Sequence, residues 1–263
     1  NTEAGPAFSD MDAAVSALLT QADTVWGGFG GAPKFPQTAS IRFLLKYHYF
    51  NPTHKNSLAH ALLCLDKMIE GGIYDQLGGG FSRYSTDGQW LAPHFEKMLY
   101  DNALLVTTLS EAYQLTKKES YHKAIIETLA FVENELMDAD GGFLSALDAD
   151  SEGVEGKFYT WSSSEIISLL QKSAPLFMAY YGVTEAGNWE HTNILHTPQP
   201  SSAVAQQFGV SEKECLKIIE NCNSILMFER NKRIRPQTDD KQLLGWNALM
   251  NTACSKAYAA TGN

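Results

Sequence analysis

The tripeptide Gly-Gly-Phe occurs three times in this chain of 263 residues, each time between two segments with helical periodicity. The copies end at Phe29, Phe81 and Phe143, so they recur at roughly 50–60 residues, a spacing typical of repeat architectures. A second repeat has an offset of 145 residues: Asn102-Ala103-Leu104 and Asn247-Ala248-Leu249 begin similar helical segments. The chain is therefore expected to build its fold from repeated helix pairs joined by glycine-aromatic loops.

The loops between these helices are long and rich in aromatic and acidic residues, as the mouth of a cavity requires. An α/α toroid, with an inner and an outer ring of helices, fits this pattern better than an open solenoid with short, uniform loops. A long helix is expected after Pro93, a β-hairpin over 81–90 and a strand over 158–161. The other expected helices cover residues 11–25, 39–50, 58–70, 119–137, 165–171, 176–181 and 211–229, with a last helix from about 243.

Composition excludes several classes of partner and cofactor. The formal net charge of −10 argues against a nucleic-acid surface, because phosphate binding needs clustered Lys and Arg. No apolar run approaches the length of a transmembrane helix, so no membrane contact is expected. The four cysteines form no Cys-x-x-Cys pair, which favours reduced, mostly buried thiols in a cytoplasmic protein. The seven histidines show no His-Glu-x-x-His spacing, and neither a metal nor another cofactor is predicted.

The stretch from Gly71 to Tyr113 holds the strongest candidate site. His94, Glu96 and Asp101 are predicted to lie in the first two turns or so of its long helix, close to glycines and aromatic residues. Such a concentration of acids and aromatics at one helix entrance indicates a functional site. The alternative is a tight helical corner with solvated charges, in which Lys97 and Asp101 form an ordinary i,i+4 pair.

Glycoside hydrolysis needs one protonated and one ionised carboxyl group. Asp101 and Glu96, near a helix N-terminus, are expected to stay ionised and to serve as base or nucleophile. Asp148 and Asp150, in an aromatic-bordered loop, are the candidate partner acids, since burial there would raise the pKa of either group. The alternatives for that loop are a solvated turn, which is favoured for Glu152, or a cation site.

Epimerisation instead needs a base that removes a carbon-bound proton, a task commonly performed by histidine. His94 has a suitable position and His191 is a distant second, although a lone histidine is more often structural. Loop aromatics and polar side chains could bind the sugar, or could simply pack against helix ends. The candidate substrate-binding residues are Phe81, Arg83, Tyr84, Trp90, Asn102, Trp161, Trp246 and Asn247.

The central segment GGIYDQLGGGFSRYSTDGQWLAPHFEKMLYDNA resembles the signature of the spermatogenesis-associated, thioredoxin-domain-containing family, whose bacterial members are called YyaL-type proteins. Further matching motifs lie within residues 27–36, 145–161, 187–196 and 233–249, so the resemblance covers nearly the whole chain. It implies an all-α fold: a partial (α/α)6 toroid of helical hairpins, glycosidase-like and related to N-acylglucosamine 2-epimerases, with short β-hairpins in the rim loops.

The resemblance also implies a thioredoxin-like domain before this region in the parent protein. Residues 1–263 are accordingly expected to be part of one toroid domain, with the remaining hairpins outside this sequence. The expected function is the binding or processing of a carbohydrate by glycosidase- or epimerase-type chemistry. The alternatives are a sugar-binding module without turnover and a non-catalytic scaffold whose partner is the thioredoxin-like domain.

Overall fold

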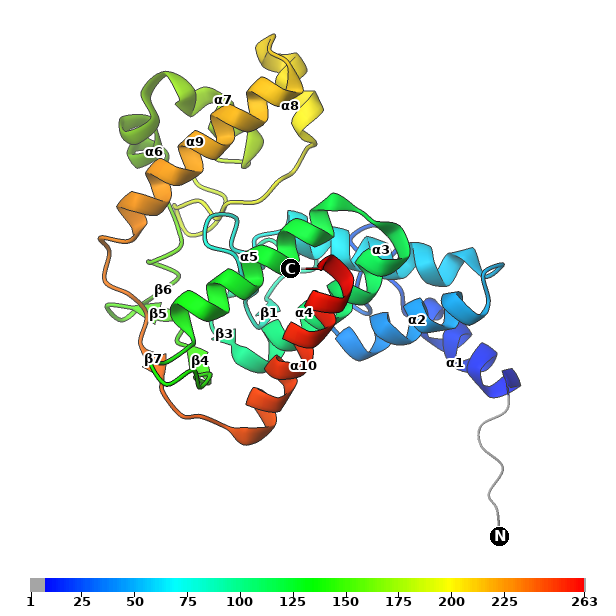
Figure 1. Cartoon of the computed structure of the whole chain (residues 1–263). Coiled ribbons are helices and arrows are strands. Elements are labelled where there is room, and N and C mark those ends of the chain that lie inside the picture. Colours follow the sequence, from blue (N-terminus) through cyan, green and yellow to red (C-terminus); the bar gives the residue numbers. More distant parts are fainter. Residues whose placement is uncertain (1–7, 263) are drawn as a thin grey trace.

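Helices make up most of the computed structural model, which describes residues 8–262 (Figure 1). The helices are α1 (Phe8–Thr20), α2 (Thr38–Phe50), α3 (Lys55–Glu70), α4 (Leu99–Thr116), α5 (Glu119–Glu135), α6 (Ser163–Leu170), η1 (Gln171–Ser173), α7 (Ala174–Tyr180), α8 (Ser201–Phe208), α9 (Glu212–Arg230) and α10 (Leu244–Thr261). The strands are two residues each: β1 (Tyr84–Ser85), β2 (Pro93–His94), β3 (Lys97–Met98), β4 (Ala146–Leu147), β5 (Asp150–Ser151), β6 (Val154–Glu155) and β7 (Thr238–Asp239).

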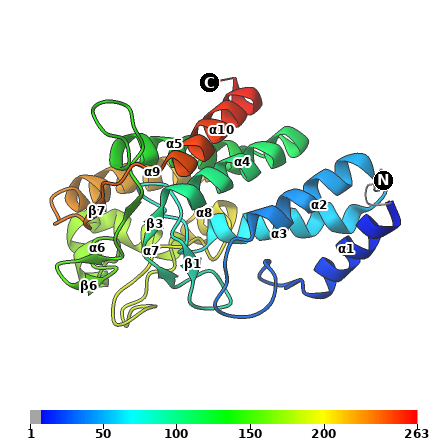
Figure 2. The same ribbon diagram turned by 90° about the horizontal axis from the view of Figure 1, so that it is seen from below.

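Five of these helices form two layers of an arc. Short connections make α2 with α3, and α4 with α5, antiparallel hairpins. Strand β3 leads directly into α4, and β7 precedes α10 by four residues. The two strands pair with opposite edges of β4, and α4 and α10 run side by side in the same direction. Figure 2 shows α10, α4 and the α2–α3 pair in succession. In the second layer, the Tyr121 hydroxyl of α5 donates to Asp66 of α3 at 2.7 Å. The all-α prediction, with helical hairpins arranged as part of a toroid, is confirmed.

A separate unit interrupts the arc between α5 and α10. Helices α6 to α9 enclose a second hydrophobic core around Trp161, Phe177 and Leu226, whereas the main core lies between the two layers of the arc (Figure 1). The helices expected over 165–171, 176–181 and 211–229 are present, but they do not continue the double layer. The short helix α8 was not expected.

The three Gly-Gly-Phe loops share one hydrogen-bond pattern. Asp23, Asp75 and Asp138 precede the three phenylalanines by five or six residues, and each carboxylate accepts two backbone N–H groups from its own loop. In each loop the residue immediately before the aspartate forms an isolated β-bridge with the phenylalanine. The second and third loops are bound by the first turns of the parallel helices α4 and α10, and Lys34, just after the first loop, forms a β-bridge with Ser85, just after the second. The expectation that all three lie on one rim is confirmed.

A buried lysine closes the first two of these loops. The ammonium of Lys34 donates to Asp23 and to the Gly27 carbonyl, and that of Lys97 donates to Asp75 and to the Gly79 carbonyl. We call these two arrangements the lysine clamps. Gly27 and Gly79 have φ angles of 68° and 71°, and a Cβ would lie 2.8 Å and 2.4 Å from neighbouring backbone atoms. Only glycine combines that conformation with that approach.

The 145-residue repeat reflects one side-chain arrangement. The amide of Asn102 accepts from the backbone N–H of Phe81 at 2.7 Å and donates to its carbonyl at 3.0 Å. Asn247 makes the same two bonds to Phe143, each at 2.9 Å. Each asparagine therefore joins the first turn of its helix to the preceding Gly-Gly-Phe loop.

We expect Asn102→Ala to lower the free energy of unfolding by about 2–3 kcal/mol, because it leaves buried backbone groups unpaired. Asn247→Ala should cost about 1 kcal/mol, since Asn247 is partly exposed and water can replace its amide. Urea denaturation of both variants checks the comparison. Equal losses, or a larger loss for Asn247→Ala, would contradict this account of the repeat.

Helix α4 begins at Leu99, several residues later than expected. His94 pairs with Tyr84 across β2 and β1, and Lys97 pairs with Leu147 across β3 and β4, so the preceding segment is held extended. The prediction that His94 and Glu96 lie in the first turns of the helix is therefore wrong. In the 158–161 segment only Trp161 forms a bridge, an isolated one. The four cysteines are free, and no helix within residues 8–262 is long and apolar enough to span a membrane.

Candidate functional site

Side chains alternate between interior and surface along the segment that leads into α4. Phe95 and Lys97 point inward and are 3% and 1% exposed, whereas His94 and Glu96 are partly exposed. Lys97 pairs with Asp75 rather than with Asp101, so the i,i+4 pair of the alternative interpretation does not form. The residues that gather on the outer side of this segment are called the rim cluster: Arg83, Tyr84, His94, Glu96, Tyr100, Asp101 and Glu155.

His94 is held between two carboxylates. Its Nδ1 lies 2.8 Å from Glu155 Oε1, and its Nε2 lies 3.7 Å from Glu96 Oε2. The His94 ring stacks on Tyr84 at 5.2 Å between centroids, and Tyr84 stacks in turn on the exposed ring of Phe35 at 4.8 Å. Contacts on both nitrogens and on one face fix the orientation of the imidazole.

Glu155 is a site residue that sequence reasoning missed. It lies on β6, which pairs with β5 so that Asp150 faces Glu155. Glu152 and Gly153 form the turn with φ angles of 55° and 74°. Two consecutive left-handed residues are typical of a two-residue hairpin loop, so the Glu-Gly step was the available signal.

Arg83 lies on the other side of Glu96. Its Nη1 is 3.3 Å from Glu96 Oε2, and it also interacts with the hydroxyl of Tyr100 and with the carboxyl group of Asp101. The Nε of Arg83 is buried and has no hydrogen-bond partner within the described chain. Arg83 therefore neutralises part of the negative charge of the rim cluster and still has a free donor.

Asp101, in the first turn of α4, is the most perturbed carboxyl group of the rim cluster. Burial raises its pKa from 3.8 to about 7; the nearby charge of Arg83 and a hydrogen bond from Tyr100 lower it, and the charge of Glu96 raises it further. Its Oδ2 is buried and unpartnered among residues 8–262. The expectation that the helix dipole would keep Asp101 ionised is therefore wrong, because desolvation outweighs the dipole.

Asp148 and Asp150 lie beside the rim cluster but are exposed. Asp148 directly follows β4, so the register of β3 with β4, continued by one residue, places it across from Glu96. Its carboxylate accepts from the N–H of Ala149 at 2.7 Å. The two loops thus meet, as the shared rim implied. Burial was expected to raise the pKa of Asp148 or Asp150, but it raises the pKa of Asp101 instead.

Several predicted substrate-binding side chains are enclosed in the protein. Phe81, Trp90, Asn102 and Trp161 are at most 1% exposed, so they offer no surface to a ligand. Trp90 Nε1 donates to the Trp26 carbonyl at 2.9 Å. The predicted binding roles of these four residues conflict with their burial. These four residues have structural roles instead. The same holds for Asn247, which binds the backbone of the third Gly-Gly-Phe loop.

Arg83, Tyr84 and Trp246 remain partly exposed on the rim. Trp246 packs on Tyr100 with ring centroids 4.8 Å apart, which extends the aromatic surface from α4 to α10. Phe35 and Tyr84 extend it toward α2. Within residues 8–262 no three His, Cys, Asp or Glu side chains are grouped as metal ligands, so the alternative cation site in the acidic loop gains no support.

Comparison with protein-family profiles finds no match. The chain is 37% identical over 270 residues to spermatogenesis-associated protein 20 of Homo sapiens, a match that covers 91% of this chain and 34% of that protein. It is 34% identical to the Mus musculus protein of the same name, with the same coverage. The chain thus spans about a third of the length of these relatives. Their names agree with the resemblance seen in the sequence, while the thioredoxin-like domain stays a prediction.

Solved structures similar to this chain include sugar-processing enzymes. One is a sugar epimerase from a ruminal bacterium, with a TM-score of 0.45, 12% identity and coverage of 95% of this chain and 79% of that one. Another is the cellobiose 2-epimerase of Spirochaeta thermophila, with a TM-score of 0.47, 15% identity and coverage of 97% and 80%. At these scores and identities the likenesses do not bear on the chemistry of this chain.

Proposed function

We propose that the rim cluster is a carbohydrate-processing site in which Asp101 is the general acid of glycoside hydrolysis and Glu96 is the base that activates the attacking water. The observation that carries this proposal is the pKa of Asp101, raised by burial to about 7 beside a second carboxyl group. Two neighbouring carboxyls whose environments differ in this way are the arrangement that acid–base hydrolysis uses. The exposed ring of Phe35 and the partly exposed ring of Trp246 supply flat apolar faces for sugar rings.

In this mechanism Asp101 gives its proton to the glycosidic oxygen as the bond from that oxygen to the anomeric carbon breaks. Glu96, bonded to Arg83, takes the proton of the attacking water and becomes protonated. Asp101 and Glu96 then exchange protons with solvent and return to their starting states.

A second candidate reaction is 2-epimerisation, favoured by the contacts of His94. A carboxylate at 2.8 Å from Nδ1 holds the ring in one orientation, as a positioned base that removes a carbon-bound proton requires. In this reaction His94 takes the proton from C2 of an open-chain aldose. Asp101 protonates the carbonyl oxygen, which gives an enediol. Rotation of the enediol about its C2–C3 bond turns its other face to His94, which returns the proton to C2 while the hydroxyl at C1 gives its proton back to Asp101.

Proton NMR in D2O tests both reactions. The protein is incubated with a panel of oligosaccharides and with aldoses such as glucose, mannose and cellobiose. Hydrolysis releases new reducing ends, whereas epimerisation exchanges the C2 proton for deuterium. We expect Asp101→Asn to lower the rate at least about 100-fold. Asp140→Asn, at an exposed turn outside the rim cluster, should have no effect.

Full activity of a folded Asp101→Asn variant would refute the role of Asp101. Neither turnover nor binding of any sugar would favour the alternative function, a non-catalytic scaffold for a thioredoxin-like domain in the parent protein.

A further inference from the structure

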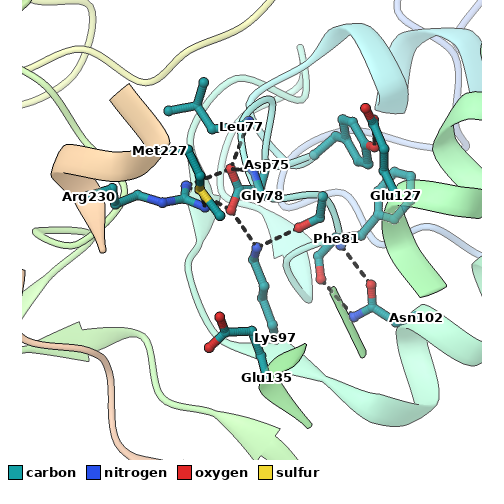
Figure 3. A network of polar contacts seen from close by, with 12 residues as sticks. Asp75, Leu77, Gly78, Phe81, Lys97, Asn102, Glu127, Glu135, Met227 and Arg230 are labelled. Atoms are coloured by element: carbon teal, nitrogen blue, oxygen red, sulfur yellow. Dashed lines mark hydrogen bonds and ion pairs between the residues drawn. The ribbon is translucent and has the colours of Figure 1, made fainter. Parts of the chain in front are cut away.

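The second lysine clamp contains one cation more than the first. In the first clamp Lys34 faces the carboxylate of Asp23, one charge against one. In the second, Asp75 accepts from Lys97 at 2.9 Å and also from Arg230 Nη1 at 2.8 Å (Figure 3). Arg230 ends α9 and reaches the rim loop from the inserted unit.

Both cations are removed from solvent, with Lys97 1% and Arg230 3% exposed. Burial raises the pKa of Asp75, but the charges of Arg230 and Lys97 outweigh it and hold that pKa well below its usual range. Asp75 is therefore ionised, and two buried cations share a single buried anion. An uncompensated buried charge costs several kcal/mol, so a further negative group is expected nearby.

A cavity of about 60 Å³ adjoins this network between α5, α9 and β7. Roughly 10–15 Å³ of such space admits one water molecule, so the cavity has room for a small polyatomic ion. Asp75, Lys97 and Arg230 line it, together with Tyr159 and Asn134. The cavity therefore offers amide and hydroxyl groups in addition to the cations.

The guanidinium group of Arg230 has unused hydrogen-bonding capacity. Nη1 binds Asp75, the sulfur of Met227 at 3.3 Å is the hydrogen-bond contact of Nη2, and the buried Nε has no partner in the described part of the chain. A buried guanidinium normally has most of its donors satisfied.

One further ion pair lines the cavity. Glu135 forms an ion pair with Arg235, whose Nη1 donates to both carboxylate oxygens of Glu135. Including this pair, three cations face two carboxylates around the cavity, which leaves a net charge of +1. The local charge therefore favours an anion.

We propose that this cavity binds a small oxyanion, either free inorganic phosphate or sulfate or the phosphoryl group of a larger molecule. Arg230 and Lys97 would balance its charge, and Arg230 Nε would donate to one of its oxygens. This site lies on the inner side of the segment whose outer side carries the rim cluster. The proposal does not depend on the carbohydrate chemistry proposed above.

The test compares thermal unfolding in phosphate with unfolding in chloride at equal ionic strength. At about 100-fold excess over Kd, phosphate should raise the Tm by roughly 5–10 °C. Arg230→Met leaves Lys97 and Asp75 as a balanced pair like the first clamp, so this variant should fold and lose the phosphate effect. Arg42→Met, which removes an arginine from a remote pair with Glu111, should keep it.

Equilibrium dialysis with radiolabelled phosphate measures the stoichiometry directly. We expect one saturable site per chain, displaced by sulfate and, if the phosphoryl group of a larger molecule can enter, also by glucose 6-phosphate. If Arg230→Met does not fold, Arg235→Met replaces it, because releasing Glu135 should weaken binding about tenfold or more. No saturable binding to the unaltered protein, or binding that survives these substitutions, would overturn the proposal.

Discussion

Replacing Asp101 with asparagine should stabilise the protein above about pH 7, by up to about 4 kcal/mol. Asparagine has the shape of the protonated carboxyl group and cannot ionise, so the variant avoids the cost of burying a charge. The expected gain follows from the difference between the ordinary pKa of 3.8 and the folded-state pKa of about 7. A stabilising substitution at a proposed catalytic residue is the usual sign of a trade-off between stability and activity.

The sign of the pH dependence is specific. Because the pKa of Asp101 is higher in the folded protein than in the unfolded chain, the folded protein binds this proton more tightly. Its contribution to stability is fully present below about pH 4, is lost as the pH rises to about 7, and then stays constant. The stability difference between Asp101→Asn and the unaltered protein should therefore grow between these two pH values.

Urea denaturation at about pH 5 and pH 8 measures this difference. Asp140→Asn, at an exposed turn, serves as the matched control and should change stability by less than about 0.5 kcal/mol at either pH. A destabilised Asp101→Asn variant at pH 8 would mean that the carboxylate of Asp101 is structural, most simply through its attraction to Arg83.

Asp75→Asn should have the opposite effect, lowering the free energy of unfolding by about 3–5 kcal/mol. The substitution keeps the shape of the side chain but leaves the ammonium of Lys97 and the guanidinium of Arg230 buried without a countercharge. It also weakens the acceptor for the backbone N–H groups of Leu77 and Gly78. Removal of one partner from a buried ionic network is among the most costly single changes.

Asp23→Asn in the first lysine clamp is the natural comparison. The Asp23 side chain is 25% exposed against 8% for Asp75, and it faces one cation instead of two. Its loss should cost about 1–2 kcal/mol. Denaturation curves with unchanged m-values would establish both numbers. Similar losses for the two variants would show that Arg230 adds nothing to the second clamp.

Repeats in the sequence were sufficient to predict the arc. Gly-Gly-Phe and the two asparagines mark positions where backbone geometry permits few residues. The residue types at these positions therefore indicate the local structure directly. The insertion of α6 to α9 was not predictable in the same way. Its helices have ordinary amphipathic patterns, and nothing in such a pattern says which neighbouring helix will cover the apolar face.

The candidate site also combines features that the sequence predicts with features that it does not. The sequence brought His94, Glu96 and Asp101 together correctly, because they are close along the chain. It could not predict that the Oδ2 atom of Asp101 is buried, that Glu155 reaches His94, or that Lys97 and Arg230 meet at Asp75. Those features depend on contacts between distant segments and on the removal of water, neither of which has a local signature.

The inserted unit also has a consequence for how the chain is made. Helix α10 packs on α4, although more than a hundred residues separate them in the chain. A ribosome adds roughly 5–20 residues per second, so the side of α4 that α10 covers stays uncovered for roughly 7–30 s. During that interval the hairpins α2–α3 and α4–α5 can fold, and α6 to α9 can fold around their own core. Docking of α10 on α4 is therefore expected only after the insertion has been synthesised, and after both hairpins have had time to fold.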